Sequence, residues 1–226
     1  MFMGGKMCGR YTLTVDPAEL REMLELGELP PDLQPRFNIA PTQAVPVVTS
    51  ALDRKVEMFH WGLIPSWSKD PSMSGRMINA RAESLHEKPA YRVPFARKRC
   101  LVLADGFYEW QHVEKSKRPF FIQLKSREPF AFAGLWDHWT ASEGEEKRSC
   151  TIVTCEPNDL MRTLHNRMPV ILDRSTMWDW LDPKASPVAL RALLVPYAGP
   201  MTAHPVSRLV NSPQNDSLEC IKPEKT

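Results

Sequence analysis

The chain has 226 residues, enough for one large domain with a sizeable hydrophobic core. With 42% hydrophobic residues, 25% charged residues and a net charge of +2, it is neither a disordered chain nor a polycation. Any contact with nucleic acid must therefore come from a local patch. No apolar run approaches the roughly 18 residues that a membrane helix needs, so we expect no membrane association.

The first strong local signal is a helix start at Asp16, which is followed by Pro17 and by Glu19 in the first turn. This helix is predicted to end near Leu26, before a proline-rich loop over residues 28–37. Strands are predicted where β-branched and apolar residues cluster. They cover residues 45–49, 55–60, 98–103, 120–124, 130–135, 150–154 and 170–172.

The runs 107–112 and 119–124 flank a polar, charged turn and predict a β-hairpin. Short helices are predicted at residues 82–85, 158–164, 175–181 and 186–194. Because these helices do not alternate regularly with the strands, a parallel doubly wound sheet is disfavoured. We expect an α+β fold: a single domain, residues 8–226, with an antiparallel, barrel-like β core and flanking short helices.

The number and spacing of the cysteines indicate the redox state of the cellular compartment in which the protein works. There are five, an odd number, and no CxxC pair occurs, so neither a disulfide framework nor a standard zinc site is supported. The segment before Cys8 holds one lysine and no apolar run, unlike a secretory signal. We expect a cytoplasmic protein in a reducing environment, with no metal site.

Cys8 directly follows Met7, and an N-terminal cysteine would arise if Met7 were removed. At pH 7 an α-amine is roughly 14% neutral and a lysine amine only about 0.04%, while an ordinary thiol is about 3% thiolate. An aldehyde can form a Schiff base with such an amine, and the neighbouring thiol can then close a thiazolidine ring. Taken alone, a lone cysteine is more often a small buried hydrophobic residue.

Seven ordered motifs spread over nearly the whole chain strengthen this interpretation. They are MCGR at 7–10, RFNIAPT at 36–42, WGLIPSW at 61–67, INARAE at 78–83, ADGFYEW at 104–110, HNRMP at 165–169 and HPVS at 204–207. Together they resemble the SRAP family, the SOS-response-associated peptidases or abasic site processing proteins. The resemblance implies covalent capture of abasic sites in single-stranded DNA and removal of residues ahead of the cysteine.

The resemblance also implies catalytic roles for four residues. Cys8 resembles the nucleophile, and Asn79 the asparagine beside it, whose amide can contact the α-amine and sugar oxygens. Glu109 resembles the catalytic glutamate, and its aromatic neighbours predict a raised carboxyl pKa that suits proton transfer. His165 resembles the histidine that passes a proton to the sugar oxygen or the amine. Taken singly, the last three are more often ordinary turn, strand and helix-end residues.

DNA contact requires cations for phosphates and flat side chains for unstacked bases. Arg10, Arg81 and Arg167 lie inside the motifs and are the expected phosphate contacts. Trp67 and Trp110 are expected to stack on, or wedge beside, the bases that flank the lesion. Asn38 and Pro41 are expected to shape the cleft.

Residues 1–7 depart from the family pattern, in which the chain begins Met-Cys. Three explanations stay open: the true start is Met7, the extension is foreign to the natural protein, or the protein excises it. In the last case the Cys8 thiol attacks the Met7 carbonyl, Glu109 and His165 move protons, and water releases the leader.

The sequence therefore predicts a monomeric abasic-site sensor that works without cofactor and is consumed as it cross-links single-stranded DNA. When bound to damaged DNA it is expected at the nucleoid. Two alternatives stay open: a general thiol peptidase that uses Cys8 and His165, and a non-covalent single-stranded DNA-binding module.

Overall fold

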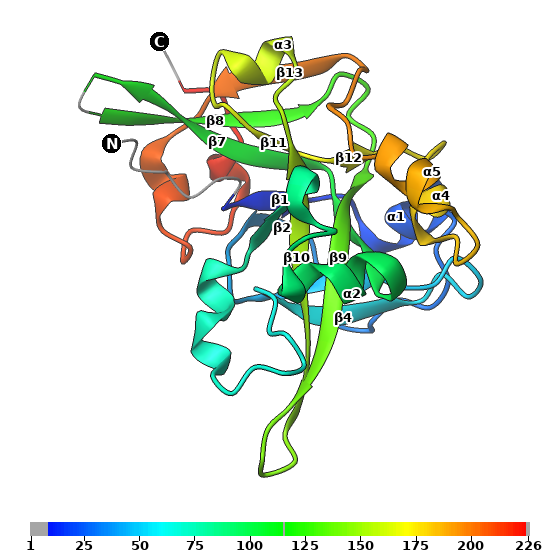
Figure 1. The fold of residues 1–226 in the computed structure, drawn as a ribbon. Coiled ribbons are helices and arrows are strands. Elements are labelled where there is room, and N and C mark those ends of the chain that lie inside the picture. Colours follow the sequence, from blue (N-terminus) through cyan, green and yellow to red (C-terminus); the bar gives the residue numbers. More distant parts are fainter. Residues whose placement is uncertain (1–8, 115, 225–226) are drawn as a thin grey trace.

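The computed structural model describes residues 9–114 and 116–224. At its centre five strands form a closed barrel, in the order β10-β4-β3-β6-β9, with β9 pairing back to β10 (Figure 1). These strands are β3 (Ala44–Val48), β4 (Val56–Trp61), β6 (Arg99–Ala104), β9 (Phe130–Thr140) and β10 (Glu146–Cys155). The pairs are antiparallel except for β10 with β4, which is parallel.

A second, fully antiparallel sheet lies against the barrel in the order β13-β8-β7-β1-β2. Its strands are β1 (Tyr11–Leu13), β2 (Arg36–Ile39), β7 (Gly106–Val113), β8 (Ser116–Leu124) and β13 (Met201–Pro205). One residue, Asp105, separates β6 from β7, so the chain passes directly from the barrel into this sheet. The three remaining strands extend the barrel sheet and are β5 (Asn79–Arg81), β11 (Met168–Pro169) and β12 (Ile171–Leu172).

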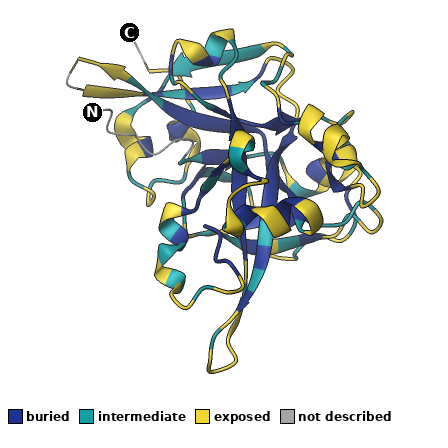
Figure 2. Cartoon of the chain, in the orientation of Figure 1, coloured by how far each residue is buried: buried dark blue, intermediate teal, exposed yellow. Residues whose placement is uncertain are grey.

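Short helices lie on the outside, with exposed outer faces over buried strands (Figure 2). The α-helices are α1 (Pro17–Met23), α2 (Pro89–Arg97), α3 (Asp159–Arg162), α4 (Met177–Leu181) and α5 (Pro187–Ala192). The 3₁₀ helices are η1 (Pro71–Arg76), η2 (Ala82–Ser84), η3 (Arg208–Asn211) and η4 (Leu218–Cys220). Among these elements none is long and apolar enough to cross a bilayer.

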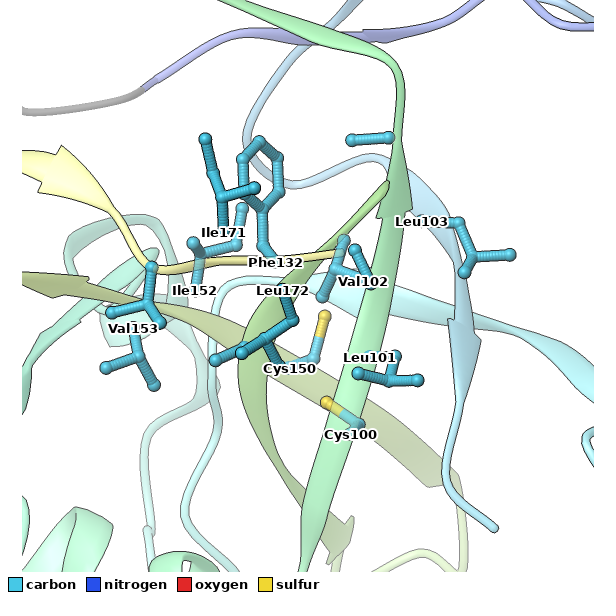
Figure 3. Close-up of a cluster of buried hydrophobic side chains, with 14 of the residues drawn as sticks. Cys100, Leu101, Val102, Leu103, Phe132, Cys150, Ile152, Val153, Ile171 and Leu172 are labelled. Atoms are coloured by element: carbon cyan, nitrogen blue, oxygen red, sulfur yellow. The ribbon is translucent and has the colours of Figure 1, made fainter. Parts of the chain in front are cut away.

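The barrel is filled by aliphatic, aromatic and thiol side chains, with Cys100 and Cys150 among them (Figure 3). Gly134 on β9 allows this packing, because a Cβ there would lie 2.8 Å from the Cys100 sulfur. Trp180 of α4 closes the same region, and its indole N–H reaches the carbonyl oxygens of Cys100 at 3.1 Å and Gly134 at 3.2 Å. The core therefore belongs to one domain.

The α+β, barrel-like architecture confirms the predicted fold class. The predicted hairpin is the β7–β8 pair, and Asp16 caps α1 by accepting the Ala18 N–H at 2.9 Å. Several details differ. Helix α1 ends at Met23, and the predicted loop over 28–37 gives way to β2 at Arg36. The strands β1, β5 and β13 were not predicted. Helix α2 was not predicted, because two prolines stand in its nine residues; burial of Tyr91 and Phe95 nevertheless secures it.

Candidate functional site

The start of the described chain lies beside β7. Tyr11 pairs with Phe107, and the backbone N–H of Tyr108 donates to the Arg10 carbonyl with an N–O distance of 3.0 Å. Because the pair is antiparallel, Arg10 lies toward the side where β7 continues to Glu109. Cys8, the predicted nucleophile, lies outside the described residues.

Glu109 is buried within β7, with 2% of its surface exposed, and its strand partner is Phe120 of β8. The predicted strand position is confirmed, and the alternative of an outward-facing surface glutamate does not apply. A buried carboxyl is uncommon unless it serves chemistry or a hydrogen-bond network. The raised pKa expected for this carboxyl stays a prediction.

Asn79 and Arg81 lie on β5, a three-residue strand parallel to β10. Asn79 pairs with Ile152 and is half-buried, whereas Arg81 pairs with Thr154 and is exposed. The Tyr91 hydroxyl of α2 donates to the Asn79 carbonyl at 3.4 Å. Residues two apart on a strand point to the same face, so Asn79 and Arg81 share one side of β5.

His165 follows α3, whose first turn is capped by Asn158 through the Met161 N–H at 3.0 Å. The His165 N–H donates to the Met161 carbonyl at 2.8 Å, and its ring Nδ1 accepts the Arg167 N–H at 3.2 Å. Half-burial lowers the pKa of the His165 imidazole, and the positive charges of Lys117 and Arg167 act in the same direction. The ring is therefore biased toward its neutral form at pH 7.

Arg167, predicted as a phosphate contact, already has an anionic partner. Its guanidinium makes two hydrogen bonds with the Glu83 carboxylate, at 2.6 and 2.8 Å, and a third with the Thr154 carbonyl at 2.7 Å. This pairing lowers the pKa of the Glu83 carboxyl. Glu83 stands inside the INARAE motif, but the sequence offered no means of pairing it with a residue 84 positions away.

Asn38 and Arg10 bind the C-terminal part of the chain. The buried Asn38 amide donates to the carbonyl groups of Val210, Ser212 and Asn215, at 3.2, 3.0 and 2.7 Å. Its oxygen accepts from the Arg10 guanidinium at 2.9 Å. These bonds hold the segment 208–216 against Asn38 of β2 and Arg10. The role of Asn38 in shaping a cleft stays a prediction.

Trp110 lies on β7, half-buried, and its indole N–H donates to the side-chain oxygen of Asn211 at 2.8 Å. The Asn211 carbonyl accepts from Arg10 at 3.1 Å. Asn211 thus joins two predicted DNA contacts, yet it was not among the predicted residues. No sequence signal marked it, because it lies outside the seven motifs.

Trp67 is 61% exposed and lines a hollow of about 440 Å³ together with Val93 of α2 and Asp137. None of the other predicted site residues lines this hollow. Pro41 is half-buried and is separated from the end of β2 by Ala40. The next residue, Thr42, donates its N–H to the Trp61 carbonyl at 2.8 Å. Hydrogen bonds therefore join Arg10 to Asn38, Arg10 and Trp110 to Asn211, and Arg167 to His165. The gathering of these residues with Glu109, Asn79 and Trp67 in one site stays a prediction.

Residues 7–213 match the family model of the SOS response associated peptidase (SRAP). The chain belongs to the SRAP family. It is 44% identical over 224 residues to the abasic site processing protein YoaM of Bacillus subtilis (strain 168), covering 96% of this chain and 99% of that protein. It is 32% identical over 260 residues to the abasic site processing protein HMCES of Xenopus tropicalis, covering 95% and 78%.

A crystal structure of a Bacteroides thetaiotaomicron protein superposes with a TM-score of 0.87 at 27% identity, covering 96% of this chain and all of that one. The resemblance seen in the motifs is thus confirmed as SRAP membership. The matched span includes Glu83 and Asn211 as well as all eleven predicted site residues.

Proposed function

We propose that this protein recognises abasic sites in single-stranded DNA and captures them covalently through Cys8, once Cys8 is the N-terminal residue. The relatives in the SRAP family that are named abasic site processing proteins support this function. The structural observation that carries it is the register of β1 on β7. The pairing of Tyr11 with Phe107 and the bond from the Tyr108 N–H to the Arg10 carbonyl run residues 10 and 11 antiparallel to the strand that carries the buried Glu109.

In the proposed reaction, the Cys8 α-amine attacks the C1′ aldehyde of the ring-opened deoxyribose, and loss of one water leaves an imine. The Cys8 sulfur then attacks the imine carbon, and the nitrogen takes up a proton, which closes a thiazolidine ring. The carbonyl bond is replaced by C–N and C–S bonds, and no oxidant or cofactor is needed. Proximity of both groups on one residue favours the closure.

Three other residues move protons or hold atoms in this proposal. Glu109 transfers protons between the amine and the carbinolamine oxygen, because its carboxyl is buried and shielded from bulk water. His165 gives a proton to the sugar ring oxygen as the ring opens. Asn79 holds the α-amine or a sugar hydroxyl through its side-chain amide.

The phosphate contacts are assigned first to Arg81, which is exposed next to Asn79. Arg10 and Arg167 use most of their guanidinium donors within the protein. They therefore contribute to DNA binding chiefly through the positive potential that they create along the bound DNA strand. Trp110 offers a flat face to an unstacked base, and Trp67 extends the stacking surface beside α2. Asn38 and Pro41 keep the walls of the cleft in place.

Removal of residues 1–7 uses the same machinery in this proposal. The Cys8 sulfur attacks the Met7 carbonyl carbon, the amide C–N bond breaks as the nitrogen is protonated, and water hydrolyses the resulting thioester. Both the amine and the thiol of Cys8 are then free. An ordinary start at Met7 with methionine removal gives the same mature terminus.

Intact mass spectrometry before and after exposure to a single strand with one abasic site tests the function. We expect a mature chain that begins Cys-Gly-Arg and an adduct mass equal to protein plus DNA minus one water. Cys8→Ala should give no adduct, and Cys8→Ser marks whether sulfur is required. Adduct formation by a chain whose leader is intact would exclude the thiazolidine. Casein cleavage without an adduct would instead favour the general thiol peptidase, and salt-sensitive binding without an adduct the binding module.

A further inference from the structure

Arg167 binds both Glu83 and the ring of His165, through two different groups. Glu83 lies in η2, directly after the strand that carries Asn79, and is the bidentate partner of Arg167. Arg167 in turn donates its backbone N–H to Nδ1 of His165 at 3.2 Å. The side chain and backbone of Arg167 thus connect the carboxylate to the imidazole, although 82 positions separate Glu83 from His165 in the sequence.

The position of Arg167 is fixed from two sides. The Glu83 carboxylate takes one hydrogen bond from each terminal guanidinium nitrogen, and the Thr154 carbonyl of β10 takes another from Nη2. The Arg167 side chain is only 14% exposed, whereas that of Glu83 is 53% exposed. Bidentate pairing between an arginine and a carboxylate fixes the guanidinium plane as well as its position. Such an anchor restrains the backbone of Arg167 too.

The hydrogen bond at Nδ1 determines which ring nitrogen holds the proton. A ring nitrogen that accepts an N–H has its lone pair available, so the neutral imidazole carries its proton on Nε2. Burial favours this neutral form. Nε2–H is therefore the donor that His165 offers to a bound sugar oxygen.

We propose that Glu83 is a positioning residue that acts through Arg167 to hold His165 in the Nε2–H tautomer. Its effect on catalysis rests on the function proposed above, whereas its effect on the tautomer does not. In this assignment the main role of Arg167 is to connect these two residues, and direct phosphate binding falls to Arg81.

The contacts of Arg167 favour this role over a second one, in which Glu83 merely competes with DNA phosphates for the arginine. Three guanidinium hydrogen bonds are already satisfied, two to Glu83 and one to Thr154, and the side chain is largely buried. A phosphate that displaced Glu83 would have to replace both Arg167–Glu83 hydrogen bonds at a guanidinium whose side chain is only 14% exposed. Arg81 on the neighbouring strand is exposed and requires no displacement.

The tautomer is measured in protein with ¹⁵N-labelled histidine rings, with the His165 signals assigned from His165→Gln. We expect Nε2–H for His165 in the native chain and a mixture of tautomers in Glu83→Gln, which keeps the side-chain shape but loses the charge. Arg167→Lys, which loses the bidentate fork, should shift the signals in the same direction. Glu87→Gln, an exposed neighbour in the sequence, should leave them unchanged. An unchanged His165 spectrum in both Glu83→Gln and Arg167→Lys would overturn the proposal.

Cross-linking rates supply the second measurement. Glu83→Gln should slow adduct formation about tenfold at pH 7, and Glu83→Asp should recover part of the rate. If Glu83→Gln reacts faster or binds DNA more tightly and His165 keeps its tautomer, the positioning role of Glu83 is overturned. Glu83 would then compete with DNA phosphates for Arg167. If the native protein forms no adduct, the proposed function fails, while the ring spectra still decide the positioning role.

Discussion

The carboxylate of Asp105 accepts a hydrogen bond from the Thr12 hydroxyl, with an O–O distance of 2.5 Å, and the Asp105 N–H returns one to the Thr12 carbonyl at 3.0 Å. Asp105 is 6% exposed and also accepts from Thr14 and from the Val15 N–H. It is the residue that joins the barrel to the second sheet. The pair therefore fixes how β1 lies against β7.

Removing these acceptors should destabilise the protein strongly. Asp105→Ala leaves two hydroxyls and two backbone N–H groups without their acceptor, and hydrogen bonds to a charged group contribute ~1.5–3 kcal/mol each. Since such losses are not additive, we expect the free energy of unfolding to fall by about 3–5 kcal/mol in urea denaturation. Asp179→Asn, on the exposed side of α4, should change it by less than ~0.5 kcal/mol. Equal effects for both variants would contradict the anchoring role of Asp105.

Trp110 should contribute to DNA affinity through its ring rather than its N–H group. Stacking of a base on an aromatic side chain contributes ~1–3 kcal/mol, so Trp110→Ala should weaken binding of a single strand about tenfold or more. Trp110→Phe loses the bond to Asn211 but keeps an aromatic face, and it should retain most of the affinity. Fluorescence anisotropy in a Cys8→Ala background isolates this non-covalent step. Trp178→Phe, at the ring that stacks on Arg54, serves as the control.

The Glu83–Arg167 pair predicts a specific acid dependence of stability. Arg167 holds the pKa of the Glu83 carboxyl below its ordinary 4.5, so the folded state releases this proton more readily than the unfolded state. The stabilisation is therefore complete above pH 4.5 and is lost as the pH falls through the lowered value. Melting temperatures of native protein and Glu83→Gln should differ by a constant amount from pH 7 to about 5.5 and converge below 4.5. A difference that stays constant as the pH falls through the acid range would contradict this linkage.

Thiol labelling should single out Cys8. The cysteines at 100, 150, 155 and 220 are buried, and burial raises the pKa of Cys100 and Cys150 and brings that of Cys155 to about 12. With iodoacetamide at pH 8, native protein should therefore gain one label on Cys8, and denatured protein should gain five. Peptide mapping locates the label. Comparable labelling of Cys155 in the native protein would show that the barrel opens on this timescale.

Local sequence patterns were sufficient for elements whose causes lie within a few residues. The side-chain cap at Asp16 and the polar, charged stretch between the runs 107–112 and 119–124 both act at short range, so α1 and the β7–β8 hairpin were predictable. The motif around Glu109 likewise placed that residue on a strand. Boundaries were less certain, since the end of α1 at Met23 depends on packing rather than on a breaker residue.

Strands of three residues, such as β1 and β5, carry no usable periodicity, and only their partners define them. The same holds for the residues that support the site: Asn211, which joins Trp110 to Arg10, and Glu83, which holds Arg167. The sequence by itself determined the chemistry available, namely the types and order of the reactive side chains. Only the tertiary structure decided which side chains meet, because hydrogen bonds and ion pairs between residues 84 to 201 positions apart depend on the closure of the barrel and the docking of the second sheet.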